Sequence, residues 1–172
     1  MPRPRAQLDT AALARAFAAD GLHGTPIDRV AAAAGLAKPT LYARGGDKEE
    51  LFALAVEAEV ERLIDRLEGA ERLSELASAL DDHLVEAPEG ARLLLVTARH
   101  RSSRVASRVE RSLQRIPDAL AAALDGERAE LLAAALLGGA HAALHGGADV
   151  ASLARVLPAP IEESPSEGIW TA

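Results

Sequence analysis

The sequence predicts an all-α fold, with an N-terminal three-helix helix-turn-helix head followed by a larger helical body. Ala and Leu, which are good helix formers, dominate the 172 residues, and 49% of the chain is hydrophobic. Apolar residues recur at helical spacing nearly throughout, whereas no alternation typical of a strand lasts five residues. Gly and Pro interrupt this pattern and divide the chain into separate helices.

The first helix is predicted over residues 10–20. Asp9 or Thr10 can cap its N-terminus, and Gly21 can end it. The residues expected to form its buried stripe are Leu13, Ala16, Phe17 and Leu22.

The next two helices are separated by a glycine turn. Thr25-Pro26 favours a helix start, because the Thr hydroxyl can cap and Pro suits the first helical position. Gly35 can adopt the left-handed conformation that ends this helix. A short helix follows over 38–43, and Gly45-Gly46 ends it. Two short helices joined in this way have the spacing of a helix-turn-helix.

The remaining helices form the body. A fourth helix is predicted to begin at Asp47, whose side chain can cap it, and to continue to Leu67. At 1.5 Å per residue it would be about 30 Å long. Further helices are predicted over 71–86, 89–101, 103–116, 118–124, 127–145 and 149–157. The chain therefore divides into a head (1–46), a body (47–157) and a tail rich in Pro, Ser and Glu (158–172).

The helix-turn-helix is a candidate DNA-binding element, because its second helix can present its N-terminal residues to the major groove. Lys can pair with phosphate or guanine, Thr with a phosphate or base edge, and a Tyr hydroxyl with phosphate. The candidate contacts are Thr25, Lys38, Pro39, Thr40, Tyr42, Arg44 and Lys48, with Arg3 and Arg5 as a candidate minor-groove arm. Helix packing alone can produce the same spacing, so spacing by itself leaves a purely structural role open.

Charge is distributed unevenly along the chain. Residues 1–48 carry seven basic and four acidic residues, whereas the other 124 carry 12 basic and 22 acidic residues. The net charge is therefore +3 for residues 1–48 and −10 for the rest of the chain. A basic head on an acidic body is one electrostatic outline of a DNA-binding module attached to a second domain.

Two segments carry a resemblance to a known family. FAADGLHGTPIDRVAAAAGLAKPTLY (residues 17–42) and DKEEL (residues 47–51) resemble the DNA-binding head of the tetracycline-repressor (TetR) family. The resemblance implies that three short helices bind double-stranded DNA and that a fourth links them to a body that binds a small molecule. It also implies a homodimer formed through the last long helices.

The chain departs from the family pattern at two positions. Gly45 stands where the family usually has an aromatic residue in the core of the head, and Ala37 stands where it usually has a capping Ser. A lost cap costs about 1 kcal/mol, and an absent core aromatic costs about 3–5 kcal/mol unless neighbours fill the space. We expect either a less rigid head or repacking by Leu22 and Leu41.

The body offers a candidate effector site. Few aromatic residues are present, so an aliphatic pocket is expected, and the candidate ligand-binding residues are His83, Thr97 and His100. Five arginines recur at helical spacing: Arg101, Arg104, Arg108, Arg111 and Arg115. This stripe could bind an anion, but a solvated face paired with the acidic body is the favoured interpretation.

The penultimate helix is the candidate dimer interface. Its small residues let two helices approach closely, and the candidate interface residues are Leu132, Leu136, Gly139 and Ala143. A core helix within one chain is the alternative. His141 and His145 could bind a metal together with Asp149 or His100, but buried or interfacial histidines are favoured and no metal site is assigned.

Other functional classes find no support in the sequence. No Cys, nucleophile elbow, phosphate loop or dinucleotide motif is present, so neither an enzyme nor a cofactor is expected. No secretory signal or membrane span is recognised, which favours the cytoplasm. We therefore expect a dimeric, ligand-responsive transcriptional regulator, most simply a repressor of a palindromic operator. The alternative is a helical dimer that binds a small molecule or protein and has lost DNA binding.

Overall fold

A computed structural model of the chain describes residues 8–97, 104–124 and 129–145. These residues form helices and contain no strand, which confirms the all-α fold class. The helices of the N-terminal half are α1 (Thr10–Phe17), α2 (Gly21–Gly24), α3 (Ile27–Ala33), α4 (Lys38–Gly45) and α5 (Lys48–Leu67). Those that follow are α6 (Leu73–Glu86), α7 (Pro88–Thr97), α8 (Ala106–Ala123) and α9 (Ala129–Leu144).

The head is built on α1 and a short helix that the sequence did not predict. Asp9 caps α1 by accepting a hydrogen bond from the Ala12 N–H at 3.0 Å, as predicted. Gly21 follows the end of α1, but with φ of 65° it begins α2 rather than a loop. The expected stripe of Leu13, Ala16, Phe17 and Leu22 is buried.

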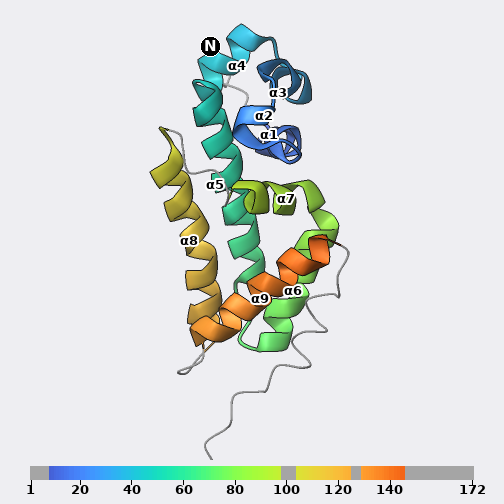
Figure 1. The fold of residues 1–172 in the computed structure, drawn as a ribbon, viewed down its shortest axis with the longest axis vertical. Coiled ribbons are helices and arrows are strands. Elements are labelled where there is room, and N and C mark those ends of the chain that lie inside the picture. The colour runs from blue at the N-terminus through green and yellow to red at the C-terminus, as the bar shows by residue number, and fades with distance from the viewer. Residues whose placement is uncertain (1–7, 98–103, 125–128, 146–172) are drawn as a thin grey trace, which may run out of the picture.

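A long central helix joins the head to the body. Asp47 caps α5, because its Oδ1 accepts from the backbone N–H groups of Glu49 and Glu50 at 3.0 Å each. α1–α4 lie around the N-terminal end of α5, α8 runs alongside α5, and α6, α7 and α9 lie below α1–α4 in this view (Figure 1). Phe17 of α1 and Phe52 of α5 meet edge to face, with ring centroids 5.2 Å apart. One hydrophobic core therefore runs from head to body.

The helix α8 corrects the prediction of two helices separated at Pro117. It runs unbroken from Ala106 to Ala123 with Pro117 inside it. A proline within a helix removes one hydrogen bond and costs about 3 kcal/mol. Ile116 and Leu120, which flank Pro117, are both buried, and α8 packs extensively against α5. The burial of this apolar face of α8 along its whole length outweighs the local cost of the proline.

The helix α9 corrects the predicted dimer interface. Leu132, Leu136 and Gly139 are buried within the chain's own core, and Ala143 is half-buried. The helix packs with this face against α8, α6 and α7. Because α9 is apolar nearly all round, its sequence does not show which face turns inward.

Several predicted features lie outside the described residues. They are the helix over 149–157, the tail over 158–172, Arg3, Arg5, His100, Arg101 and Asp149.

Candidate nucleic-acid interface and body cavity

The turn between α3 and α4 presents α4 as a projecting helix. Gly35 has a φ of 63°, and the Leu36 N–H donates to the Ala31 carbonyl at 3.0 Å. Ala37 is the N-cap of α4, and its side chain makes no capping hydrogen bond. Leu41 and Gly45, four residues apart, anchor α4 in the core.

The exposed surface of α4 carries most of the predicted DNA contacts. Lys38, Pro39 and Arg44 are exposed, Tyr42 is 39% exposed, and Thr40 is half-buried. In Figure 1, α3 and α4 lie at the end of the molecule farthest from α9. These side chains are therefore placed where an external partner can reach them.

Lys38 is held by an acid from the neighbouring helix. Its Nζ lies 2.5 Å from Oδ1 of Asp28 on α3, and both side chains are exposed. The hydrogen bond and charge of Asp28 raise the pKa of Lys38 above its ordinary value. Lys38 therefore remains charged at neutral pH, but a phosphate must compete with Asp28 for it.

Thr25 occupies a different position from the one predicted. Its side chain is fully buried, and its hydroxyl donates to the Ala16 carbonyl at 3.5 Å instead of capping α3. The N-cap of α3 is Pro26. Thr25 therefore joins α3 to α1, and its hydroxyl is not presented to an external partner.

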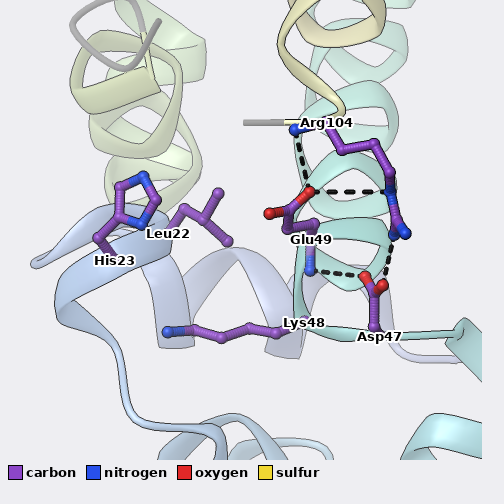
Figure 2. A pocket seen from close by; sticks show the side chains of 6 residues that line it. All are labelled: Leu22, His23, Asp47, Lys48, Glu49 and Arg104. Atoms are coloured by element: carbon purple, nitrogen blue, oxygen red, sulfur yellow. Dashed lines mark hydrogen bonds and ion pairs between the residues drawn. The ribbon is translucent and has the colours of Figure 1, made fainter. Parts of the chain in front are cut away.

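Lys48 borders a cleft where head and body meet. The cleft has a volume of about 370 Å³ and is lined by both charged and apolar groups. Figure 2 shows Lys48 extending from α5 toward the wall formed by Leu22 and His23. On the opposite wall, Arg104 pairs with Asp47 and approaches Glu49. Lys48 thus lies at the head–body junction.

The space that an aromatic residue would occupy at position 45 is filled. A Cβ on Gly45 would overlap Cδ2 of Leu51 and lie 2.7 Å from Cδ1 of Leu8. Leu51 is fully buried and Leu8 is half-buried. The expected repacking therefore occurs, but through Leu8 and Leu51 and not through Leu22 and Leu41.

The arginine stripe of α8 pairs with α5. Arg108 donates to Oε2 of Glu50 at 2.7 Å and to Oε2 of Glu57 at 2.5 Å. Arg115 donates to Oε2 of Glu61 at 3.0 Å. Neighbouring carboxylates raise the pKa values of Arg104, Arg108 and Arg115 above the ordinary value. The favoured interpretation, a face paired with the acidic body, is confirmed for these three arginines.

An apolar cavity of about 230 Å³ lies within the body. Five helices line it, through residues such as Leu63 of α5, Leu94 of α7, Ile116 of α8 and Leu137 of α9. His83 of α6 is the one polar side chain among the lining residues. A cavity of this composition suits an aliphatic ligand with a single polar group.

Two of the three predicted ligand-binding residues lie in the described part of the chain, and their placements differ. His83 lines the cavity and is 2% exposed. Thr97 is buried, but its hydroxyl donates to the Leu93 carbonyl at 2.6 Å and it does not line the cavity. The internal hydrogen bond satisfies the Thr97 hydroxyl, so Thr97 is a structural residue of α7.

The sequence analysis missed a buried acid behind His83. Glu59 of α5 is 1% exposed, and its Oε1 lies 3.1 Å from Nε2 of His83. The guanidinium of Arg62 pairs with Oε2 of Glu59 and also donates to the Thr10 hydroxyl at 3.4 Å. An acid on the apolar face between Val56 and Leu63 was the signal in the sequence.

The surroundings of Glu59 stabilise its charged form. Burial by itself would raise the pKa of this carboxyl, but contacts with His83 and Arg62 outweigh burial and lower the pKa. A Cβ at Gly90, near the start of α7, would overlap the carboxylate. Glu59 is therefore enclosed by α5, α6 and α7.

His141 and His145 are adjacent but exposed. Their ring centroids are 4.8 Å apart on one face of α9, so they are not buried within the chain, and the expectation that they lie in an interface stays a prediction. Among the described residues, no group of three or more His, Asp or Glu side chains could hold a metal ion. Within the same residues, no helix is both long enough and apolar enough to cross a membrane.

Comparison with known proteins confirms the resemblance carried by residues 17–51. Residues 10–55 match the family model for bacterial regulatory proteins of the tetR family. Comparison with curated sequences finds no significant match.

Solved structures of similar fold extend this likeness over nearly the whole chain. A TetR-like transcriptional regulator from Rhodococcus sp. RHA1 is 25% identical, with a TM-score of 0.66 over 91% of this chain and 93% of that one. A second transcriptional regulator from the same source is 26% identical, with a TM-score of 0.61 over 80% of each chain. The fatty acid degradation regulator FadR from Bacillus halodurans shares the fold at 17% identity, with a TM-score of 0.64 over 86% and 92% of the two chains.

Proposed function

We propose that the chain is a TetR-family transcriptional regulator with an N-terminal helix-turn-helix domain, and that it is a ligand-responsive repressor acting as a homodimer. The observation that carries this proposal is the exposure of Lys38, Pro39 and Tyr42 on α4, whose Leu41 is buried in the core. A projecting helix with basic and hydroxyl groups at its start suits the major groove. The proposal includes a cytoplasmic location and no catalytic activity.

The proposed DNA contacts are Lys38, Pro39, Thr40, Tyr42, Arg44 and Lys48. Lys38 exchanges Asp28 for a phosphate or a guanine edge when DNA binds. Two heads related by two-fold symmetry would contact half-sites one DNA turn apart, at a spacing of roughly 34 Å. The operator is therefore expected to be palindromic.

The proposed dimer interface uses the exposed face of α9. Leu131 is 69% exposed, and most exposed residues that share its face are small or histidine: Ala134, Gly138, His141, Ala142 and His145, with Glu130 at its start. Small residues permit close helix approach, and an exposed leucine supplies apolar area to bury. This face replaces the predicted Leu132, Leu136 and Gly139, which the chain already buries.

The proposed effector site is the body cavity, and Glu59 links it to the head. His83 lines the cavity, Glu59 lies against His83, and Arg62 joins Glu59 to Thr10 at the start of α1. Two of these contacts cross between helices: His83 to Glu59 joins α6 to α5, and Arg62 to Thr10 joins α5 to α1. An effector that moved His83 would alter how α5 holds the head, and a coupling of about 1–3 kcal/mol would change DNA affinity 5- to 150-fold.

DNA binding by the head is tested with fluorescence anisotropy on labelled DNA from upstream of the protein's own gene, beside a scrambled duplex. Lys38→Ala and Tyr42→Phe should weaken binding to the upstream DNA without changing thermal unfolding. Ala43→Ser, at an exposed position of the same helix, is the matched control. Full affinity in both variants would contradict the assigned contacts.

A second candidate function is a helical dimer that binds a small molecule or protein and no longer reads DNA. The uncapped start of α4 and the pairing of Lys38 with Asp28 favour it. Salt dependence separates the two candidates, because each phosphate contact releases counterions. Affinity that falls steeply between about 50 and 200 mM salt indicates DNA binding, whereas a flat and weak response indicates its loss.

A further inference from the structure

Lys38 is a proposed DNA contact that already lies against an acid. Its Nζ lies 2.5 Å from Oδ1 of Asp28, and the side chains of Lys38 and Asp28 are 47% and 74% exposed. Asp28 belongs to the first turn of α3, whereas Lys38 is the first residue of α4, so the pair bridges the two helices of the helix-turn-helix. DNA that reaches Lys38 therefore also meets the charge of Asp28.

The basic residues of the head are not all compensated in this way. Of those that the structure describes up to position 48, Arg15 and Arg29 also pair with acids. Arg44 and Lys48 form no ion pair with a described residue. The charges of Arg44 and Lys48 can therefore attract a phosphate without a competing carboxylate, whereas the charge of Lys38 cannot.

The charge of Asp28 disfavours a phosphate at Lys38. A phosphate oxygen at hydrogen-bond distance from Nζ, about 2.9 Å, would lie no more than about 5.4 Å from Oδ1 of Asp28 while the pair stays together. This distance is shorter than the Debye length of about 8–10 Å, so salt screens the repulsion only in part. Because Lys38 and Asp28 together carry no net charge, they also gain little from the counterion release that drives sequence-independent binding.

A guanine edge is a different kind of partner. Its O6 and N7 atoms accept hydrogen bonds in the major groove and carry no formal charge. Asp28 therefore repels guanine much less than it repels a phosphate, and the ammonium of Lys38 has enough N–H donors for both guanine atoms. The acid thus changes which partner Lys38 prefers.

We propose that Asp28 is a specificity-determining residue, which makes Lys38 a reader of guanine instead of a phosphate contact. The inference rests on the proposed DNA contacts of α4, and it decides between the two partners proposed for Lys38. Asp28 needs no contact with DNA for this role, because its charge acts through Lys38. DNA without a guanine in the right register offers Lys38 only phosphates, so Asp28 lowers the affinity for that DNA most.

Asp28→Asn removes the charge and keeps the shape of the side chain. Fluorescence anisotropy compares its binding to a scrambled duplex and to the genomic fragment that the natural chain binds most tightly, between about 50 and 200 mM salt. On the scrambled duplex, one new surface ion pair in each of two heads should raise the affinity about two- to thirtyfold. The slope of log affinity against log salt should steepen by about 0.9 for each head.

The affinity of Asp28→Asn for the genomic fragment should rise by a smaller factor, so that discrimination between the two duplexes falls. An unchanged affinity and slope on the scrambled duplex would overturn the proposal. An equal gain on both duplexes would also overturn it, because Asp28 would then lower affinity without selecting a sequence.

Two further variants test whether the effect passes through Lys38. Asp20→Asn removes the same charge from another exposed ion pair of the head, with Arg29, and should raise the affinity for the scrambled duplex less than Asp28→Asn does. In a chain that already carries Lys38→Met, Asp28→Asn should lose most of its gain. An equal gain from Asp20→Asn, or a full gain without Lys38, would mean that net charge alone matters and that the proposal is wrong.

Chemical substitution in the DNA locates the guanine. 7-Deazaguanine, which lacks the N7 acceptor, replaces each guanine of the genomic fragment in turn. At one position in each half-site, it should weaken binding of the natural chain about two- to tenfold, the effect of one hydrogen bond. The same substitution should not affect Lys38→Met. If no position behaves in this way, Lys38 does not read guanine.

Failure of this inference differs from failure of the proposed repressor. If the natural chain prefers one fragment and Asp28→Asn discriminates equally well, the repressor stands and the role of Asp28 is wrong. If the natural chain prefers no fragment, the repressor is wrong and the inference that rests on it falls as well. The preference of the natural chain, measured first, separates these two cases.

Discussion

Glu59 is a charged residue buried among the helices of the body. It is a buried carboxylate that contacts three helices, and removing a partner from a buried polar pair leaves a desolvated group behind. Because Glu59 lies on the apolar face of α5, the protein buries this carboxylate in spite of the cost of desolvation. The other acids of α5 lie at partly or fully exposed positions, and four of them, Glu49, Glu50, Glu57 and Glu61, pair with arginines.

Glu59→Gln keeps the shape of the side chain and removes its charge. We expect the free energy of unfolding at pH 7 to fall by about 1–3 kcal/mol, because Arg62 loses its charged partner. Glu61→Gln, an exposed position on the same helix, is the control and should change stability by less than about 0.5 kcal/mol. Urea denaturation at pH 7 measures both.

The same variant should alter the acid dependence of stability. The pKa of Glu59 is lowered in the folded protein, so its stabilisation is complete above about pH 4.5 and is lost as the pH falls through the folded-state pKa. The natural chain should therefore lose stability on acidification more steeply than Glu59→Gln. Parallel curves for the two proteins would contradict the assigned charge state.

Gly45 shows how a missing side chain is compensated. Leu8 and Leu51 occupy the space beside it, so Gly45→Ala should destabilise by about 1–3 kcal/mol despite the better helix propensity of Ala. Ala43→Gly, on the exposed side of α4, measures the propensity difference alone and should cost about 0.5–1 kcal/mol. If Gly45→Ala stabilised by the amount that Ala43→Gly loses, the packing account would be wrong.

At the scale of elements, α5 and α8 form a charged seam along the molecule. Arg104, Arg108 and Arg115 of this seam all reach carboxylates on the α5 side. These groups are partly exposed, so each pair contributes little and salt screens it. Arg104 pairs with Asp47, the N-cap of α5, beside the junction with the head (Figure 2).

Arg108→Met tests this seam. We expect the free energy of unfolding to fall by about 1 kcal/mol or less. Because the interaction is electrostatic, this loss should be smaller in roughly 0.5–1 M salt, where the Debye length is shorter. Arg111→Met is the matched control on the same helix, since Arg111 is exposed and makes no ion pair with a described residue. Thermal unfolding at two salt concentrations compares them. If both variants lost the same amount of stability, helix propensity and not the ion pairs would explain the effect.

The sequence predicted most elements but not all their boundaries. Caps such as Asp9 and Asp47, and the turn at Gly35, are local signals, and the structure confirms them. Pro117 was a misleading signal, because burial of its neighbours overrides the local break. The direction in which α9 faces could not be predicted, since its apolar residues surround the helix.

The candidate site could be predicted only where it depends on residues that are close together in the sequence. The exposed face of α4 follows from the helix-turn-helix spacing and the family resemblance. The burial of Thr25 and the pairing of Lys38 with Asp28 depend on contacts between helices, which one sequence does not reveal. The same is true of Glu59 and His83, which lie 24 residues apart in the sequence.

At the scale of the whole molecule, the account requires two copies of the chain. Leu131→Asp places a charge on the exposed face of α9 and should convert the dimer to a monomer in sedimentation velocity. Val85→Asp, at the 79% exposed Val85 on α6, is the control and should leave the dimer intact. Dissociation by Val85→Asp but not by Leu131→Asp would move the interface to α6.

Selection of bound DNA tests the central claim most directly, because it assumes no operator. The purified protein is mixed with fragmented genomic DNA at about 100 mM salt, and the retained fragments are sequenced beside those retained by Lys38→Ala. The account predicts one enriched inverted repeat with half-sites about 10 base pairs apart, and its loss in the variant. Retention of fragments without a shared sequence, or equal enrichment by both proteins, would contradict a repressor that reads DNA through α4.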